Sequence, residues 1–141
     1  MIGIVATLAA ALFAGAAIYI NLVEHPARLA CGTELAAQQF GPSYKRATVM
    51  QVSLALVATL AGLGNWLSGA GAPWLAGALL IFAVIPFTLI VILPTNNKLR
   101  DLGRDKGSDE TRRLLERWGR LHSVRSLLSL AATLTYLRAL V

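Results

Sequence analysis

Residues 2–23 read IGIVATLAAALFAGAAIYINLV and contain no charged side chain. A helix of about 20 such residues is long enough to cross the hydrocarbon core of a bilayer. Two more uncharged windows follow at 47–67 and 73–93, and a fourth at 121–141 has polar and charged residues near its two ends. Inside a bilayer every backbone polar group needs a partner within the protein, so we expect all four windows to be helices. The sequence therefore predicts four membrane spans.

The composition of the whole chain agrees with this prediction. Of 141 residues, 56% are apolar and 14% are charged, and the mean hydropathy is +0.62. Soluble domains are usually about 45–50% apolar and about 25% charged. The single cysteine, Cys31, excludes an internal disulfide. The predicted fold class is all-α: one membrane domain over residues 1–141, an integral membrane antiparallel four-helix bundle whose abundant Ala and Gly allow close helix packing.

The positive charges predict how the bundle is oriented. All but two of the 13 Lys and Arg residues lie in two connections, 24–46 and 94–120. Positive charge favours the cytoplasmic side, so we place both long loops in the cytoplasm and both termini outside the cell's inner membrane. Because these charges lie between apolar spans, we expect a lipid bilayer and no nucleic acid as the partner.

The two connections have helix signals of their own. The segment Pro26–Gln39 predicts an interfacial helix after the first span, ended by Gly41-Pro42. Lys98–Lys106 mixes charges of both signs and is expected to be a solvated turn. Ser108 then serves as the N-cap of a helix that continues into the fourth span.

Most polar residues of the spans lie at the cytoplasmic end. Trp118, His122 and Arg125 are spaced four and three residues apart, so they share one face of the fourth helix. Arg125 lies about 6 Å inside the predicted span at 1.5 Å per residue. A charge at that depth needs a partner, and Glu24 is the expected counter-charge. Single residues of this kind are often interfacial anchors, but four segments converge here. The other members of the predicted chamber are His25, Arg46, Gln51 and Asn96.

Two kinds of chemistry fit these residues. A neutral histidine can act as a general base near physiological pH, and Arg125 or Arg46 would stabilise the resulting anion. Alternatively, His25, His122 and Glu24 would form the two-histidine, one-carboxylate set that binds non-haem iron, and histidine also suits copper. Adjacent helical residues such as Glu24 and His25 diverge by about 100°, so we favour the base. The cofactor stays open between iron, copper and none.

Five strings of this sequence resemble a family of small bacterial and fungal membrane proteins described as anthrone oxygenase-like, a domain of unknown function. They are VEHPAR at 23–28, PSYKR at 42–46, PFT at 86–88, LPTN at 93–96 and WGRLHSVR at 118–125. Their order and spacing match over nearly the full chain. Fungal members are described as oxidising an anthrone to an anthraquinone with molecular oxygen.

The resemblance implies an oxygenase or oxidoreductase whose partners are a lipophilic aromatic substrate and dioxygen. His122 would be the base and Arg125 would hold the anion, while Glu24 and His25 would orient or ligate. The implied substrate-binding residues are Trp118, which would stack on the ring, and Asn96, Gln51 and Arg46. The alternative is a non-catalytic membrane module that binds a lipophilic ligand or a partner membrane protein through its Gly- and Ala-rich helix surfaces.

Overall fold

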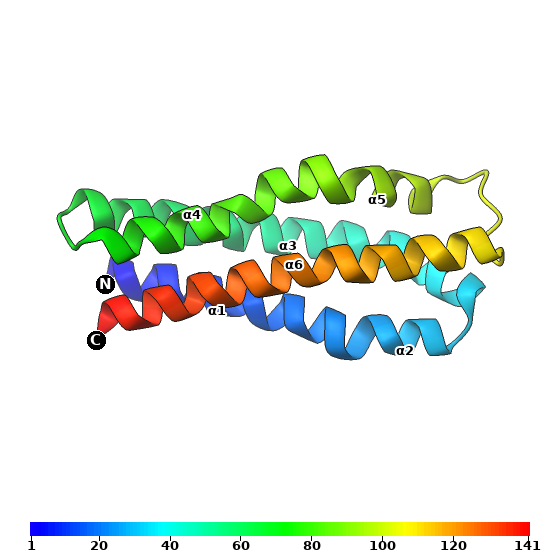
Figure 1. Ribbon diagram of the computed structural model, residues 1–141, viewed down its shortest axis with the longest axis horizontal. Coiled ribbons are helices and arrows are strands. Elements are labelled where there is room, and N and C mark those ends of the chain that lie inside the picture. The colour runs from blue at the N-terminus through cyan, green and yellow to red at the C-terminus, as the bar shows by residue number, and fades with distance from the viewer.

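The computed structural model describes residues 1–141 as four long helical segments that lie side by side in antiparallel order (Figure 1). Both termini and the short turn at 68–71 lie at one end of the bundle, and the other two connections lie at the opposite end. This arrangement confirms the predicted all-α bundle. The segments are α1 (Ile2–Tyr19), η1 (Ile20–Glu24) and α2 (His25–Ala30); α3 (Thr33–Leu67); α4 (Ala72–Phe87), η2 (Thr88–Ile92) and α5 (Leu93–Arg100); and α6 (Asp109–Leu140).

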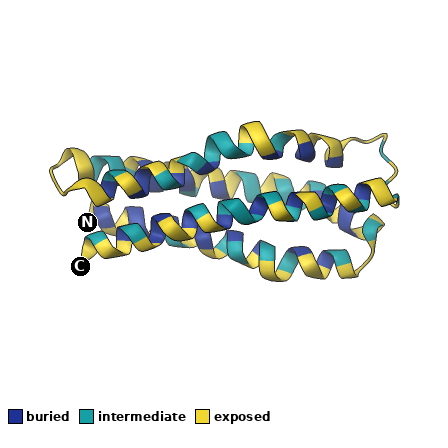
Figure 2. Cartoon of the chain, viewed as in Figure 1, coloured by how far each residue is buried: buried dark blue, intermediate teal, exposed yellow.

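The four segments form a ring around one interior. α1 packs against α3 and α6, and α4 packs against the same two helices. Buried residues line the interior, while much of the outer surface is exposed and apolar (Figure 2). Three segments are long and apolar enough to cross a membrane: Ile2–Ala30, Thr33–Leu67 and Ala72–Leu99. An apolar exterior is what a bundle surrounded by lipid requires.

The connections differ from the prediction in two places. The helix after the first span is short: it ends at Ala30, and Gly32 follows with a backbone φ of 97° that favours glycine. The predicted stop at Gly41-Pro42 is wrong, because α3 continues through Pro42 to Leu67. Phe40 and its neighbours lie on the turns before Pro42 and are buried in the bundle. This burial stabilises the helix across the proline.

The third segment also continues further than predicted. It remains helical to Arg100, so the solvated turn begins at Asp101 rather than at Lys98. The predicted N-cap of the last helix is confirmed, since Ser108 Oγ accepts the backbone N–H of Thr111 at 3.2 Å. From this cap, α6 runs without a break to Leu140.

Two π-helical turns interrupt the first and third segments just before a proline. The N–H of His25 bonds to the carbonyl of Ile20, and the N–H of Leu93 bonds to that of Thr88, five residues back in each case. Pro26 and Pro94 have no N–H for the carbonyl four residues earlier, so the helix register changes there. Such turns are frequent at functional sites. The third segment bows outward at η2 (Figure 1).

The end of the bundle that carries the termini is closed by tight packing around Tyr136. The Tyr136 hydroxyl donates to the Ala58 carbonyl at 2.9 Å, and its ring stacks on Trp74 with centroids 5.3 Å apart. A Cβ atom on Gly62 would overlap the Tyr136 hydroxyl, and one on Gly77 would overlap the ring. Glycine at both positions is therefore what lets α3, α4 and α6 meet around this side chain.

We expect Gly77→Ala to lower the free energy of unfolding by about 1–3 kcal/mol, the usual cost of overpacking a core. The added methyl group has no free space beside the Tyr136 ring. Thermal unfolding of the detergent-solubilised protein measures the change. Gly15→Ala is the control, because no neighbouring atom lies within 4 Å of the place where its methyl group would be. A similar loss in both variants would contradict this account.

Candidate functional site

The structure brings four of the predicted polar residues into one buried layer near the π-helical turns. His25, Gln51, Asn96 and His122 are each at most 5% exposed. They come from α2, α3, α5 and α6, so every helical segment contributes one residue. Gln51, Asn96 and His122 line the same small cavity. The predicted convergence of these segments is therefore present, although the members do not all play equivalent parts.

His122 is held in one orientation by Asn21. Its Nδ1 atom lies 2.7 Å from Asn21 Oδ1, and Ser126 Oγ donates to the same oxygen at 2.6 Å. The Asn21 amide nitrogen donates to the Gly119 carbonyl at 2.9 Å, which fixes which end of the amide faces the imidazole. Nδ1 must then carry the proton, because Oδ1 can only accept. Nε2 has no hydrogen-bond partner in the protein, so its lone pair is free.

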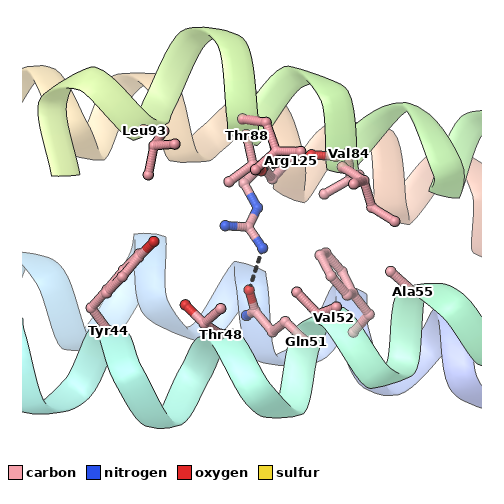
Figure 3. Close-up of a pocket in the computed structure, with 12 residues that line it drawn as sticks. Tyr44, Thr48, Gln51, Val52, Ala55, Val84, Thr88, Leu93 and Arg125 are labelled. Carbon is pink, nitrogen blue, oxygen red and sulfur yellow. Dashed lines mark hydrogen bonds between the residues drawn. The ribbon is translucent and has the colours of Figure 1, made fainter. Parts of the chain in front are cut away.

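Arg125 lies one turn further along α6 and points across the interior to α3. Its Nη2 atom donates to Gln51 Oε1 at 2.6 Å, and its guanidinium lies 5.5 Å from the centre of the Phe13 ring (Figure 3). Arg125 Nε and Gln51 Nε2 are buried without partners. No carboxylate pairs with this arginine, so the predicted Glu24–Arg125 pair is wrong. The positive charge remains available to an anion.

Glu24 pairs instead with Arg28 on the next helical turn. Its carboxylate also accepts from Ser43 Oγ at 3.0 Å and from Gln39 Nε2 at 3.2 Å. Arg28 is close enough for an i, i+4 contact, whereas Arg125 points into the bundle. Glu24 therefore ties α2 to the first turns of α3. Sequence reasoning missed Arg28 as a buried partner, although its spacing from Glu24 was visible.

His25 lies behind Trp118 rather than in the cavity. Its Nε2 atom donates to the Leu115 carbonyl at 2.9 Å, and its ring centroid is 5.0 Å from that of Trp118. Trp118 also packs against His122, with ring centroids 4.7 Å apart. A methyl group on Gly119 would lie 2.7 Å from the His25 ring, so glycine makes room for it. His25 supports the indole that borders His122.

The predicted metal ligands are not assembled into a metal site. No group of three or more His, Cys, Asp or Glu side chains is positioned to hold a metal ion. The Glu24 carboxylate is engaged by Arg28, Ser43 and Gln39, and His25 is separated from the cavity by Trp118, so the set of His25, His122 and Glu24 does not fit the two-histidine, one-carboxylate site.

Arg46 is also placed away from the chamber. It is exposed and borders outer grooves of the bundle. The interior face of α3 carries Tyr44, Thr48 and Gln51, spaced four and three residues apart. Arg46 lies two residues from both Tyr44 and Thr48, which turns it to the opposite side of the helix. The prediction that Arg46 binds substrate is therefore not supported by its position.

Two adjoining cavities surround the Arg125–Gln51 contact. The polar cavity has a volume of about 20 Å³, roughly enough for one water molecule. Asn96 faces this cavity, and both its amide oxygen and its amide nitrogen are buried without partners. The second cavity is larger, about 90 Å³, and mainly apolar. Tyr44, Thr48, Gln51 and Arg125 line both cavities.

Tyr44 and Thr48 are site residues that sequence reasoning missed. Tyr44 and Thr48 lie two turns and one turn before Gln51 on the same face of α3. The signal was hidden because the second helix was expected to begin near residue 47, after the predicted stop. Asn21, at the end of the first span, contacts the last helix through its amide.

We expect Asn21→Ala to lower the free energy of unfolding by about 2–4 kcal/mol, because it leaves several buried partners unsatisfied. The variant removes the bonds to His122, Ser126 and Gly119. Unfolding in detergent with increasing dodecyl sulfate measures the loss. Asn97→Ala is the matched control, since Asn97 is exposed and makes no side-chain hydrogen bond. Comparable stability of the two variants would refute the anchoring role of Asn21.

Comparison with known proteins gives one consistent result. The family described as anthrone oxygenase matches residues 40–135. Anthrone oxygenase tpcL of Aspergillus fumigatus is 31% identical over 94% of this chain and 89% of its own length. Anthrone oxygenase gedH of Aspergillus terreus is 33% identical over 85% of this chain and 86% of its own. No solved structure matches the chain at a significant level.

Proposed function

The chain belongs to the anthrone oxygenase family, and on that premise we propose that it is a membrane-embedded oxygenase that oxidises a lipophilic, anthrone-like aromatic substrate with dioxygen. The observation that carries the proposal is the free Nε2 atom of His122. Asn21 fixes the proton on Nδ1, so the basic nitrogen has no competing partner in the protein. The substrate class is taken from the names of the relatives, and the mechanism from the residues around His122.

The first step is removal of a proton from the methylene carbon between the two outer rings. His122 Nε2 accepts this proton. The electron pair left on carbon is delocalised through the central ring onto the carbonyl oxygen opposite, which becomes an oxyanion. Arg125 stabilises the oxyanion, since its charge is not neutralised by a carboxylate. Gln51 Nε2 is a second buried donor beside it.

The second step forms a bond between the same carbon and one oxygen atom of dioxygen. His122 returns its proton to the outer oxygen, and the carbon carries a hydroperoxide. Loss of the second methylene hydrogen and cleavage of the oxygen–oxygen bond release water and leave a carbonyl group. One oxygen atom is thus in the quinone and the other in water. Dioxygen supplies the oxidising equivalents, and the substrate is oxidised without another reductant.

The surroundings of His122 support this chemistry because they exclude bulk water. The imidazole is 1% exposed and borders Trp118. Electrostatic interactions are stronger in such a closed site than in water. His25 Nδ1 is also buried without a partner, but His25 lies behind Trp118 and lines neither cavity, so it acts as a positioning residue that holds the indole.

We expect His122→Asn to lower kcat at least about 100-fold, the usual contribution of a general base. The asparagine amide keeps a donor near the position of Nδ1, so the contact with Asn21 can persist while the base is lost. Oxygen uptake by purified protein with a hydroxylated anthrone measures the rate, after subtraction of spontaneous oxidation.

His25→Gln is the matched control for the second histidine. Glutamine keeps an N–H donor for the Leu115 carbonyl, so we expect kcat to fall less than tenfold. Equal losses in the two variants would contradict the assignment of the base to His122. Wild-type protein that binds the anthrone without any oxygen uptake above background would favour the non-catalytic binding module instead.

A further inference from the structure

The apolar cavity lies between α3 and the α4–η2 segment, and the Arg125–Gln51 contact crosses it (Figure 3). Gln51 is 1% exposed, so this contact forms the inner end of the cavity. Val52 and Ala55 line it from α3, and Val84 and Thr88 line it from the facing segment. Its only cation is Arg125, and its polar groups gather around that residue. The cavity therefore has an apolar body and one polar end, and its volume of about 90 Å³ suits one ring of a flat aromatic molecule that carries an oxygen substituent.

The cavity is open toward the outside of the bundle rather than toward the loops. Val52 and Leu89 line it and are 42% and 58% exposed. Both belong to segments that are long and apolar enough to cross a membrane. An opening bordered by these residues faces hydrocarbon. A lipophilic molecule dissolved in the bilayer would reach it without passing through water.

The helix geometry explains why the opening is at this position. Thr88 and Leu89 begin the π-helical turn, where the backbone has left the α-helical register before Pro94. The Thr88 hydroxyl is bonded back to the Val84 carbonyl at 2.7 Å, so it does not close the gap toward α3. The π-helical turn and the cavity therefore share Thr88 and Leu89.

The inner end of the cavity has donors without acceptors. Gln51 Nε2 and Arg125 Nε are buried and unpartnered. A buried donor without a partner costs about 1–3 kcal/mol, so a ligand that supplies acceptor oxygens is favoured there. Carbonyl and phenolic oxygens of an aromatic substrate are acceptors of this kind.

We propose that the aromatic substrate enters sideways from the bilayer between α3 and η2, and binds with one oxygen-bearing ring in the apolar cavity and its oxygens at Gln51 and Arg125. This inference rests on the proposed function, because it takes the same substrate class. The polar cavity at His122 shares Gln51 and Arg125 with the apolar one. Movement of the Gln51 side chain toward the ligand joins the two cavities and brings the reacting carbon to the base.

The test uses a hydroxylated anthraquinone, which has the same ring system but no methylene group to oxidise. Its binding to wild-type protein in lipid nanodiscs is followed by its visible absorbance after rapid mixing. We expect Val52→Trp and Leu89→Trp each to lower the association rate at least tenfold. Leu89→Ala widens the opening, so we expect it to raise the association rate. A rise cannot result from misfolding, so this variant shows that the losses in the tryptophan variants come from blocking the opening.

Leu127→Trp is the matched control, because Leu127 is a similarly exposed leucine on α6 that lines neither cavity. We expect it to bind at the wild-type rate. Unchanged association in both Val52→Trp and Leu89→Trp would overturn lateral access. His122→Asn separates the two hypotheses: normal binding without oxygen uptake supports both. Full oxygen uptake in His122→Asn would refute the proposed base even if the opening is correct.

Discussion

The candidate site depends on one hydrogen bond, from His122 Nδ1 to Asn21 Oδ1. An amide can present either end to an imidazole, but the bond from Asn21 Nδ2 to the Gly119 carbonyl leaves only the oxygen for His122. The Gly119 carbonyl of α6 orients the Asn21 amide, and the Asn21 amide in turn determines which nitrogen of the His122 imidazole carries the proton. Anything that rotated the first helix against the last would change which nitrogen is basic. The packing of the bundle and the chemistry of the site are linked at this contact.

The same layer contains the two π-helical turns, and each contributes to the site in a different way. The turn before Pro26 includes Asn21, which orients the His122 imidazole. The turn before Pro94 includes Thr88 and Leu89, which border the apolar cavity. Proline removes one backbone donor and one regular turn in each case. The tight packing around Tyr136 at the opposite end provides the rigidity that the irregular layer lacks.

Sequence reasoning predicted the helices because the segments are apolar enough for lipid, and few structures other than a helix pair every backbone polar group there. It also placed Trp118, His122 and Arg125 on one face, because that depends only on spacing within a single helix. The pairings between helices were less predictable. Glu24 pairs with Arg28 rather than Arg125, and Arg46 points outward, because these outcomes depend on how each helix is rotated. The mistaken helix stop at Gly41-Pro42 hid the interior face that begins at Tyr44.

The absence of a carboxylate beside Arg125 bears on the last step of the proposed oxidation, the release of product. A quinone product retains the oxygens that the inner donors bind, and an ionised phenol on it would be attracted more strongly than the neutral substrate. Departure of the oxidised molecule, rather than the oxidation itself, would then limit turnover. The lipid phase outside α3 and η2 would serve as the reservoir that draws the oxidised product away from the protein.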